Sequence, residues 1–337
     1  MTISDQIRSL VAQGLTSKHI AAACKRADPS GLDEVLRAIR PTGQPIPIDK
    51  RLICIGDPTW PERLDHFTMM GGPWWLWCEG ITSALSCPTT VAIVGTRQAS
   101  ADGLQLAYTI ANDLAQHGIT VVSGMAQGID QAAHRGCLAG GGLTIGVLGC
   151  GLEVPYPANA TALKAEVIAQ GCLVSEQPPA MPIAYPGQFL ERNRIIAGLA
   201  DAVVIIEAKQ RSGALNTAGW AATYNRECLV VPSSPTNRSA AGSLALIRDG
   251  CLMVRNGHDV REALGLTNSA DEPVSGVPPV LHERVQEIYT LLGPQPTAMD
   301  TLCAHTGLPI AEVMARCGEL MNAGLASMTG EGIYRLT

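Results

Sequence analysis

The chain has 337 residues, a formal net charge of −6 and 46% hydrophobic residues. This length predicts two or three domains with ordinary hydrophobic cores. The acidic balance excludes a surface that is basic throughout, so a polyanion would need a local cluster of cations. No apolar run approaches the roughly 18 residues of a membrane span, and the first residues lack the pattern of a signal peptide.

The eleven cysteines are scattered along the chain and include no Cys-x-x-Cys pair. This spacing argues against a zinc site and against a framework of disulfides. It is typical of reduced thiols in the cytoplasm, where we expect the protein to be located. We expect neither a metal nor a cofactor.

Residues 1–48 are expected to form a small helical domain. Apolar residues recur at helical spacing between Ile3 and Val11 and between Leu32 and Ile39. Prolines at positions 41, 45 and 47 end the pattern. The pattern leaves open whether this module caps the fold, mediates oligomerisation or contacts DNA.

Residues 49–265 are expected to form the main domain. Its first part holds two short apolar segments, 52–55 and 74–77, which we expect to be extra strands of the main sheet. The tryptophans of the second segment, Trp74, Trp75 and Trp77, could stack on nucleic-acid bases. Packing in the core is the favoured interpretation of this cluster.

The stretch from 91 to 246 repeats one pattern, in which an apolar strand ends in a small, polar or glycine-containing turn and a helix begins. This pattern is typical of an open parallel sheet with helices on both faces, a Rossmann-like α/β fold. Ligands of such sheets bind outside the carboxyl ends of the strands, where glycine lets N–H groups approach phosphate. The strands are expected at 91–97, 121–125, 144–151, 173–176 and 203–208.

The first turn of this edge is Gly95-Thr96-Arg97. Glycine permits a tight turn, threonine offers a hydroxyl, and the guanidinium fork of arginine matches phosphate. On its own the motif is also compatible with a surface arginine that follows a strand. Its place at the edge of the sheet favours phosphate binding.

The second turn follows the strand at 121–125 and contains Ser123, Gly124 and Gly128. The glycines bracket a loop whose N–H groups could cradle an anion. Asp130 and His134 lie four residues apart on one helical face, a spacing that also occurs in metal and acid–base sites. Helix capping by Asp130 is the favoured interpretation, because no third ligand and no nucleophile is evident.

Gly146-Val-Leu-Gly149-Cys-Gly151 resembles part of a dinucleotide-binding fingerprint, but it is out of register. It also lacks an acidic residue about 20 positions further on that could hold a ribose. We therefore expect these glycines to serve close backbone packing and not an NAD site.

The densest basic motif is Arg192-Asn193-Arg194. The two arginines are two residues apart, so on a helix they cannot both face the same way. We expect one to bind ligand while the other pairs with Glu191 or Glu207.

The turn after the fifth strand carries Lys209, Ser212, Gly213 and Thr217. Ser212 and Gly213 open a helix and resemble an anion-binding N-terminus. Together with the other turns, this one should line the edge with cations and free N–H groups.

Residues 266–279 are expected to be a linker and 280–337 a winged helix, with helices at 280–292, 299–305 and 309–323 and strands on either side of 330–332. Residues 271–337 hold 3 Lys and Arg against 8 Asp and Glu. The third helix has one cation, Arg316, against Glu312 and Glu319, whereas helices that read the major groove bring several cations. We expect this domain to contact protein or to regulate the chain itself.

The motifs together resemble the DNA processing protein A family (DprA, also called Smf). The resemblance implies an extended Rossmann-like domain between an N-terminal SAM-like helical domain and a C-terminal winged helix. It also implies a cytoplasmic homodimer that binds single-stranded DNA, protects it during natural transformation and helps to load RecA. The matching segments are 94–97, 122–134, 147–151 with 156–157, 175–176, 192–199 and 207–218.

By this resemblance Arg97 is the phosphate-binding arginine, and Arg192, Asn193, Arg194, Ser212, Gly213 and Thr217 lie beside the same pocket. The chain departs from some members of the family at Ala158, where a basic residue can stand, and at Phe189-Leu190, which replaces a Phe-Pro pair. It also has Val231-Pro232-Ser233 in place of a Val-Pro-Gly turn, and no Lys or Arg between 166 and 191. These departures imply a weaker or differently routed DNA track.

The main alternative is an enzyme that acts on nucleotides, similar to the phosphoribohydrolases of the LOG family. Those enzymes carry a Pro-Gly-Gly-x-Gly-Thr turn that is followed by a catalytic glutamate. This chain has Ser212-Gly-Ala-Leu-Asn-Thr217 instead, without a glutamate just inside the helix. We therefore expect a binding protein and no catalytic constellation.

Overall fold

The computed structural model describes residues 2–24, 32–39, 45–67, 70–183, 185–267, 283–293, 296–322, 326–329 and 332–335. The chain divides into two compact units, Met1–Leu266 and Thr267–Thr337. Most of the expected linker, 268–279, lies outside the described residues. The expected boundary at residue 48 falls inside the first unit, so a separate domain at 1–48 stays a prediction.

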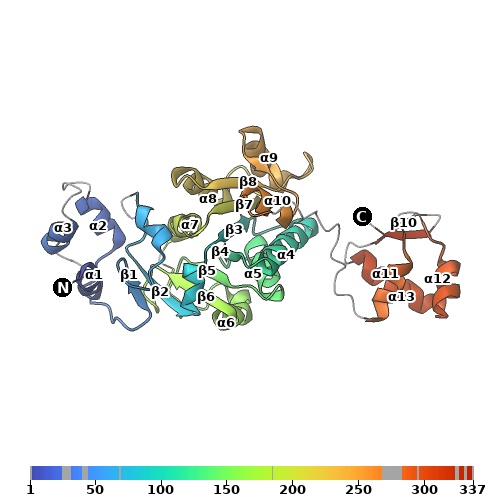
Figure 1. The fold of residues 1–337 in the computed structure, drawn as a ribbon, viewed down its shortest axis with the longest axis horizontal. Helices are drawn as coiled ribbons and strands as arrows, with labels where there is room; N and C mark the ends of the chain where they lie inside the picture. The colour runs from blue at the N-terminus through green and yellow to red at the C-terminus, as the bar shows by residue number, and fades with distance from the viewer. Residues whose placement is uncertain are drawn as a thin grey trace. The chain divides into compact units, whose positions relative to one another are not determined.

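A nine-stranded sheet forms the centre of the first unit, in the order β1-β2-β6-β5-β4-β3-β7-β8-β9 (Figure 1). The strands from β6 to β9 in this order are parallel, and β1 and β2 join them antiparallel. This confirms the Rossmann-like sheet and its two added strands. The strands are β1 (Leu52–Cys54), β2 (Trp75–Gly80), β3 (Thr90–Gly95), β4 (Thr120–Ser123), β5 (Thr144–Leu148), β6 (Gly171–Ser175), β7 (Ala202–Ile206), β8 (Glu227–Val230) and β9 (Leu252–Met253).

Helices cover both faces of this sheet. Successive side chains of a strand point to opposite faces, so the apolar strands have two apolar faces that must both be buried. Val91 and Ile93 of β3 belong to one core, shared with α4, α5 and α10. Ala92 and Val94 belong to the other, shared with α7 and α8. The helices are α4 (Ala101–Gln116), α5 (Ile129–Ala139), α6 (Thr161–Gln170), α7 (Gly187–Leu199), α8 (Gly213–Thr223), α9 (Ala241–Arg248) and α10 (Gly257–Ala263), with 3₁₀ turns η2 (Glu62–Phe67), η3 (Thr82–Ser86), η4 (Ala158–Ala160) and η5 (Arg238–Ala240).

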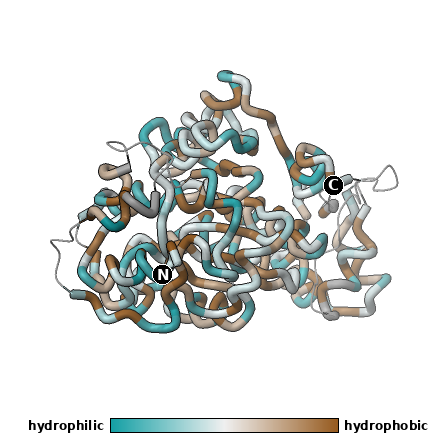
Figure 2. Tube along the Cα trace, turned by 60° about the vertical axis from the view of Figure 1, so that its left-hand side comes forward, coloured by the Kyte–Doolittle hydropathy of each residue, from teal (hydrophilic) through white to brown (hydrophobic). Residues whose placement is uncertain are grey.

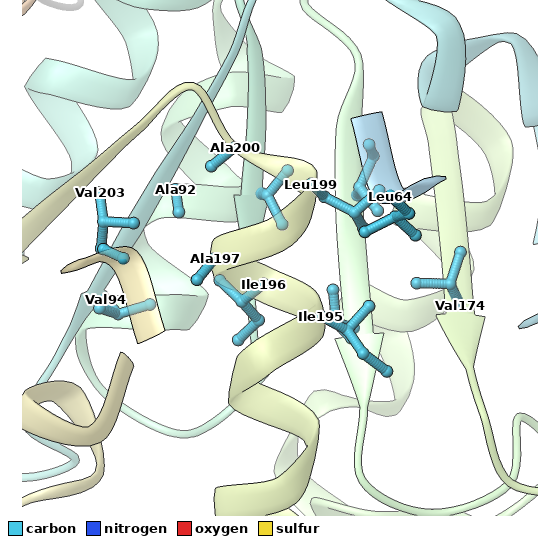
Figure 3. Close-up of a cluster of buried hydrophobic side chains, with 14 of the residues drawn as sticks. Leu64, Ala92, Val94, Val174, Ile195, Ile196, Ala197, Leu199, Ala200 and Val203 are labelled. Carbon is cyan, nitrogen blue, oxygen red and sulfur yellow. The ribbon is translucent and has the colours of Figure 1, made fainter. Parts of the chain in front are cut away.

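Helix α7 is anchored by apolar side chains on the sheet (Figure 3). Ile195, Ile196 and Leu199 are each 1% exposed and share a core with strand residues such as Val174 and Val203. Burying one such side chain contributes about 1.5–3 kcal/mol. This packing fixes the basic motif of α7 relative to the strand ends.

The N-terminal helices α1 (Ile3–Ala12), α2 (Ser17–Cys24) and α3 (Leu32–Ala38) contribute to a further core, together with residues of β1, β2 and α6. The start of α1 is fixed by a capping box between Thr2 and Asp5. Trp74, Trp75 and Trp77 lie inside this core and are at most 3% exposed. Their interpretation as core is confirmed, and base stacking on them is excluded.

The second unit has the three helices and the hairpin of a winged helix. They are α11 (Glu283–Leu291), α12 (Met299–Thr306), α13 (Ile310–Asn322), β10 (Ala326–Thr329) and β11 (Gly332–Arg335). The strands pair antiparallel, and Thr297 bridges to Ile333. Ile288, Leu302 and Val313, one from each helix, are fully buried in its core.

Hydrophobic and hydrophilic stretches alternate along the chain and do not gather into one long apolar segment (Figure 2). Within the described residues, no helix has the length and apolar content that crossing a membrane would require.

Candidate functional site

The order of the parallel strands reverses between β3 and β7. From β3 the chain continues through β4, β5 and β6 on one side, and then through β7, β8 and β9 on the other. Open α/β sheets bind ligands outside the carboxyl ends of the strands at such a point. The turn Gly95-Thr96-Arg97 leaves the sheet here.

Gly95, which is partly buried, and Thr96, which is buried, shape this turn. A Cβ atom on Gly95 would lie 1.9 Å from the carbonyl oxygen of Ile206, so only glycine fits between the strands. The N–H of Thr96 donates to the carbonyl oxygen of Glu207 at 2.9 Å. The hydroxyl of Thr96 accepts from the N–H of Gln98 at 3.2 Å. Both residues hold the turn in place and leave Arg97 at the surface.

Arg97 is exposed and lies over the ring of Phe189, with 5.3 Å between the guanidinium carbon and the ring centroid. This distance lies within the range of cation–π attraction. Among the described residues, no carboxylate forms an ion pair with Arg97. The guanidinium charge is therefore oriented by an aromatic ring and remains available to an anion.

A small cavity of about 90 Å³ lies beside Arg97. Pockets that enclose whole cofactors usually measure roughly 300–1,000 Å³, so this cavity suits a phosphate-sized group and not an entire nucleotide. Its lining includes Arg97, Gly124, Gln127, Gly149, Tyr156, Phe189 and Arg192.

Arg192 forms the inner wall of this cavity and is 7% exposed. Its Nη1 donates to the carbonyl oxygen of Gly124 at 2.7 Å and to that of Val147. Burial lowers the pKa of Arg192 to about 10, against the attraction of Asp130, so the side chain stays charged at neutral pH. A Cβ on Gly124 would lie 2.6 Å from Nη2 of Arg192. Only glycine therefore lets the guanidinium come this close to the backbone.

Asp130 and His134 are buried residues of α5. Burial raises the pKa of Asp130 to about 6, opposed first by Arg192, and its Oδ2 accepts from the N–H of Ala126 at 3.3 Å. Burial lowers the pKa of His134 to about 3, and its Nδ1 lies 2.7 Å from the hydroxyl of Thr144. Among the described residues, no cluster of His, Cys, Asp and Glu could hold a metal ion. The pair is part of the interior.

Arg194 binds Glu176, a partner that the sequence did not indicate. Its Nη2 donates to both carboxylate oxygens, at 2.9 and 2.7 Å, and the hydroxyl of Ser17 donates to the same carboxylate. The expected pairing of an arginine with Glu191 or Glu207 was therefore wrong for Arg194. The ion pair joins α7 to β6 and α2 and leaves Arg194 little freedom to reach a ligand.

Three further predicted residues hold backbone carbonyls within the edge. The hydroxyl of Ser123 donates to the carbonyl oxygen of Ile93 at 2.6 Å. Asn193 and Thr217 both donate to the carbonyl oxygen of Gly213, at 3.1 and 3.3 Å. These side chains fix β4 to β3, and α7 to the start of α8.

Gly128 brings the β4–α5 loop against the β3 turn. Its φ is +88°, and a Cβ would lie 2.5 Å from the carbonyl oxygen of Thr96, so a side chain here is both strained and blocked.

The turn before α8 offers further exposed polar groups. Lys209 is exposed, and its Nζ donates to the side-chain oxygen of Gln98 at 3.1 Å. Ser212 precedes the first residue of α8, Gly213, which is exposed. The hydroxyl of Ser212 is itself buried and has no hydrogen-bond partner among the described residues.

Sequence reasoning missed two features of the edge. Phe189 was noted only as the phenylalanine that Leu190, in place of a proline, follows, and not as the ring under Arg97. The buried Glu207 (φ +48°) accepts from the N–H of Ser100 at 2.8 Å and from Asn237 at 2.9 Å. Glu207 directly follows a buried strand in the sequence. This position was the available signal that its carboxylate would be buried and would accept hydrogen bonds from neighbouring loops.

A larger cavity of about 630 Å³ lies between the N-terminal helices and the loop after β6. Its lining is mainly apolar and rich in proline. Its arginine, Arg51, binds Asp49 at 2.7 Å and Glu153 at 2.8 Å. This cavity therefore offers no free cation to a phosphate, and the β3 edge is the better candidate site.

The sheet, whose parallel strand order reverses at β3, and the winged helix define a Rossmann-like protein with an added winged helix domain. Its candidate site is the β3 edge, where Arg97 has no carboxylate partner among the described residues. Residues 51–265 match the family model of DNA recombination-mediator protein A, and residues 276–321 match the DprA winged helix domain. The chain belongs to the DNA processing protein A family (DprA, also called Smf).

Curated relatives agree with this assignment. A putative DNA processing protein DprA of Mycobacterium tuberculosis is 40% identical over 300 residues, which cover 85% of this chain and 77% of the relative. DprA of Bacillus subtilis is 32% identical over 266 residues, which cover 77% of this chain and 86% of the relative.

Two solved structures are also similar. DprA of Streptococcus pneumoniae matches with a TM-score of 0.63 and 30% identity, over 78% of this chain and 98% of that one. DprA of Helicobacter pylori matches with a TM-score of 0.56 and 30% identity, over 64% of this chain and 95% of that one. The structure of the H. pylori protein was described for its single-stranded DNA binding mode.

Proposed function

We propose that this chain binds single-stranded DNA and holds the sugar-phosphate backbone at the β3 edge. The observation that carries the proposal is Arg97, an exposed cation over the ring of Phe189 and beside a cavity of about 90 Å³. A cation next to an aromatic face suits an unpaired strand, because phosphate binds the cation and a base can stack on the ring. The H. pylori relative, with its single-stranded DNA binding mode, supports this proposal.

The predicted site residues divide into three roles in this proposal. Some contact the strand, some shape the turns, and some hold the edge together from inside. The first group is Arg97, Lys209, Gly213 and the backbone of Ser212; the second is Gly95, Thr96, Gly124 and Gly128; the third is Ser123, Arg192, Asn193, Arg194 and Thr217.

The direct test is the affinity of Arg97→Ala for an oligothymidylate at low salt, measured by fluorescence anisotropy. We expect a loss on the order of tenfold, because one phosphate contact and the cation over Phe189 disappear together. Lys50→Ala is the control, since Lys50 is also exposed and precedes β1, the edge strand that four other strands separate from β3. Equal affinities of the two variants would refute the proposed pocket.

We further propose that the protein acts in the cytoplasm as a homodimer, protects incoming strands during natural transformation and helps to load RecA on them. Membership of the family supports each of these points. Strand exchange by RecA on DNA coated with a single-strand binding protein should accelerate when this chain is added. Size-exclusion chromatography with light scattering should report the mass of a dimer.

An enzyme that acts on a nucleotide is the second candidate. Asp130 favours it, because a carboxyl with a pKa of about 6 can exchange protons near neutral pH. However, Asp130 is 6% exposed and is not part of the cavity lining. The first turn of α8, where the LOG-like enzymes carry a glutamate, has no acidic residue. Release of free base from a nucleoside monophosphate would establish this alternative.

A further inference from the structure

We infer that Lys209, Arg211 and Arg238 form a second phosphate-binding patch, which carries the strand from Arg97 across the carboxyl ends of β7 and β8. The inference rests on the proposed function and adds the route of the strand. The ligand class is the sugar-phosphate backbone of an unpaired polynucleotide, bound without regard to sequence.

The three cations of this patch come from two neighbouring loops. Lys209 and Arg211 lie between β7 and α8, and Arg238 lies between β8 and α9. All three residues are exposed. In the described part of the chain, none of them forms an ion pair with a carboxylate, in contrast to Arg51 and Arg194. Within the described residues, no acidic side chain therefore neutralises their charges.

The two loops are joined by hydrogen bonds next to these cations. Nδ2 of Asn237 donates to the buried carboxylate of Glu207 at 2.9 Å, and Oδ1 of Asn237 accepts from the N–H of Ser239 at 2.9 Å. Asn237 thereby caps η5, whose first residue is Arg238. The backbone that carries Arg238 is thus fixed to the end of β7.

A second contact brings the start of α9 against the same turn. The N–H of Gly242 donates to the carbonyl oxygen of Ala208 at 2.7 Å. A Cβ on Gly242 would lie 2.6 Å from the carbonyl oxygen of Lys209. The two loops therefore pack together without space between their backbones, and their cations form one patch.

The patch is continuous with the Arg97 site on two sides. Nζ of Lys209 donates to the side chain of Gln98, the residue after Arg97, at 3.1 Å. A Cβ on Gly213 would lie 3.9 Å from Cδ2 of Leu190, the exposed residue after Phe189. A strand that leaves the cavity at Phe189 thus reaches the start of α8 and the patch directly.

The start of α8 adds N–H groups to these cations. The helix has 11 residues, and the side chain of its N-cap, Ser212, makes no capping hydrogen bond. The first N–H groups of a helix have no partner inside it and favour negative charge. Together with Lys209 and Arg211 on the preceding turn, they suit a phosphate that lies across the end of β7.

The test compares the full chain with the triple variant Lys209→Gln, Arg211→Gln, Arg238→Gln. Affinity is measured against oligothymidylates of about 5 and about 20 nucleotides over a range of salt concentrations. We expect the variant to lose on the order of tenfold for the long strand and less than twofold for the short one. Its log–log salt slope for the long strand should be shallower by up to about 2, at roughly 0.7 per lost contact.

A matched variant, Lys50→Gln, Arg135→Gln, Arg248→Gln, removes the same charge from exposed residues elsewhere. It should bind both strands like the unmodified chain, and both variants should unfold at the same temperature. If the patch variant behaves like this control, or loses affinity equally for both lengths, the inference is overturned. Arg97→Ala separates the two claims, because it can still weaken both strands when the patch is wrong.

Discussion

Two pairs of cations at the same edge of the sheet have opposite environments. Arg97 and Lys209 are exposed and have no carboxylate partner among the described residues, whereas Arg192 is 7% exposed and Arg194 is bound to Glu176. All four were predicted to belong to the phosphate-binding site, with one of the two α7 arginines paired to a glutamate. The difference teaches that one basic motif can hold the edge of a sheet together from inside, while another motif at the same edge leaves its cations exposed.

The geometry of α7 explains the division. Arg192 and Arg194 are two residues apart, and, as predicted, they face different ways. Arg192 reaches carbonyl oxygens of Gly124 and Val147, while Arg194 reaches Glu176 after β6. One helix thus ties together the ends of three neighbouring strands.

Arg192→Ala gives the largest expected effect. Removing this arginine leaves the carbonyl groups of Gly124 and Val147 without their donor and removes the charge that most opposes the burial of Asp130. Leaving a buried acceptor without its donor costs about 1–3 kcal/mol per group. Urea unfolding should show this loss for Arg192→Ala and almost none for Arg97→Ala. Equal stability of the two variants would contradict the distinction between the exposed cations and the cations that hold the edge together.

The pH dependence of folding stability tests the buried side of the same comparison at Asp130. Its pKa in the folded protein, about 6, lies above the usual 3.8, so the folded state binds more protons than the unfolded chain between these values. The contribution of Asp130 to stability is therefore greatest below about 4, falls as the pH rises to about 6, and then stays constant.

The measurement is the free energy of unfolding of the unmodified chain minus that of Asp130→Asn, at several pH values. This difference should fall by on the order of 1–3 kcal/mol between pH 4 and pH 6. A difference that is flat or rises over the interval would show that the carboxyl is not raised in pKa.

Removal of residues 280–337 gives the smallest expected effect. Arg316 of α13 donates to Glu312 at 2.7 Å and lies 3.6 Å from Glu287, so the cation of the third helix is neutralised. Affinity for single-stranded DNA should stay within a few-fold of the full chain in the same anisotropy assay. A large loss would place a DNA contact in the winged helix.

The sheet and its helices could be predicted because their signals are local. The central strands are short apolar runs, and β3, β4 and β6 end in the small residues Gly95, Ser123 and Ser175. Gly95 and Gly128 stand where a Cβ would collide with backbone. The winged helix could be predicted from helical spacing and the glycines of its hairpin. The tryptophan core could also be predicted, from the apolar segment around Trp74.

The burial of the α7 arginines could not be predicted, because their partners are distant in the sequence. Arg192 bonds to carbonyl groups 68 and 45 residues earlier, and Arg194 to a carboxylate 18 residues earlier. A backbone carbonyl carries no residue-specific signal. Only the three-dimensional arrangement separates these arginines from Arg97.

The central claim is that Arg97 contacts DNA phosphate, and the salt dependence of binding tests it most directly. The affinity for single-stranded oligothymidylate should fall linearly with salt on a log–log plot, and Arg97→Ala should make the slope shallower by about 0.7. A double-stranded oligonucleotide of the same length should bind more weakly at every salt concentration. Identical slopes and affinities for Arg97→Ala and the unmodified chain would contradict the account.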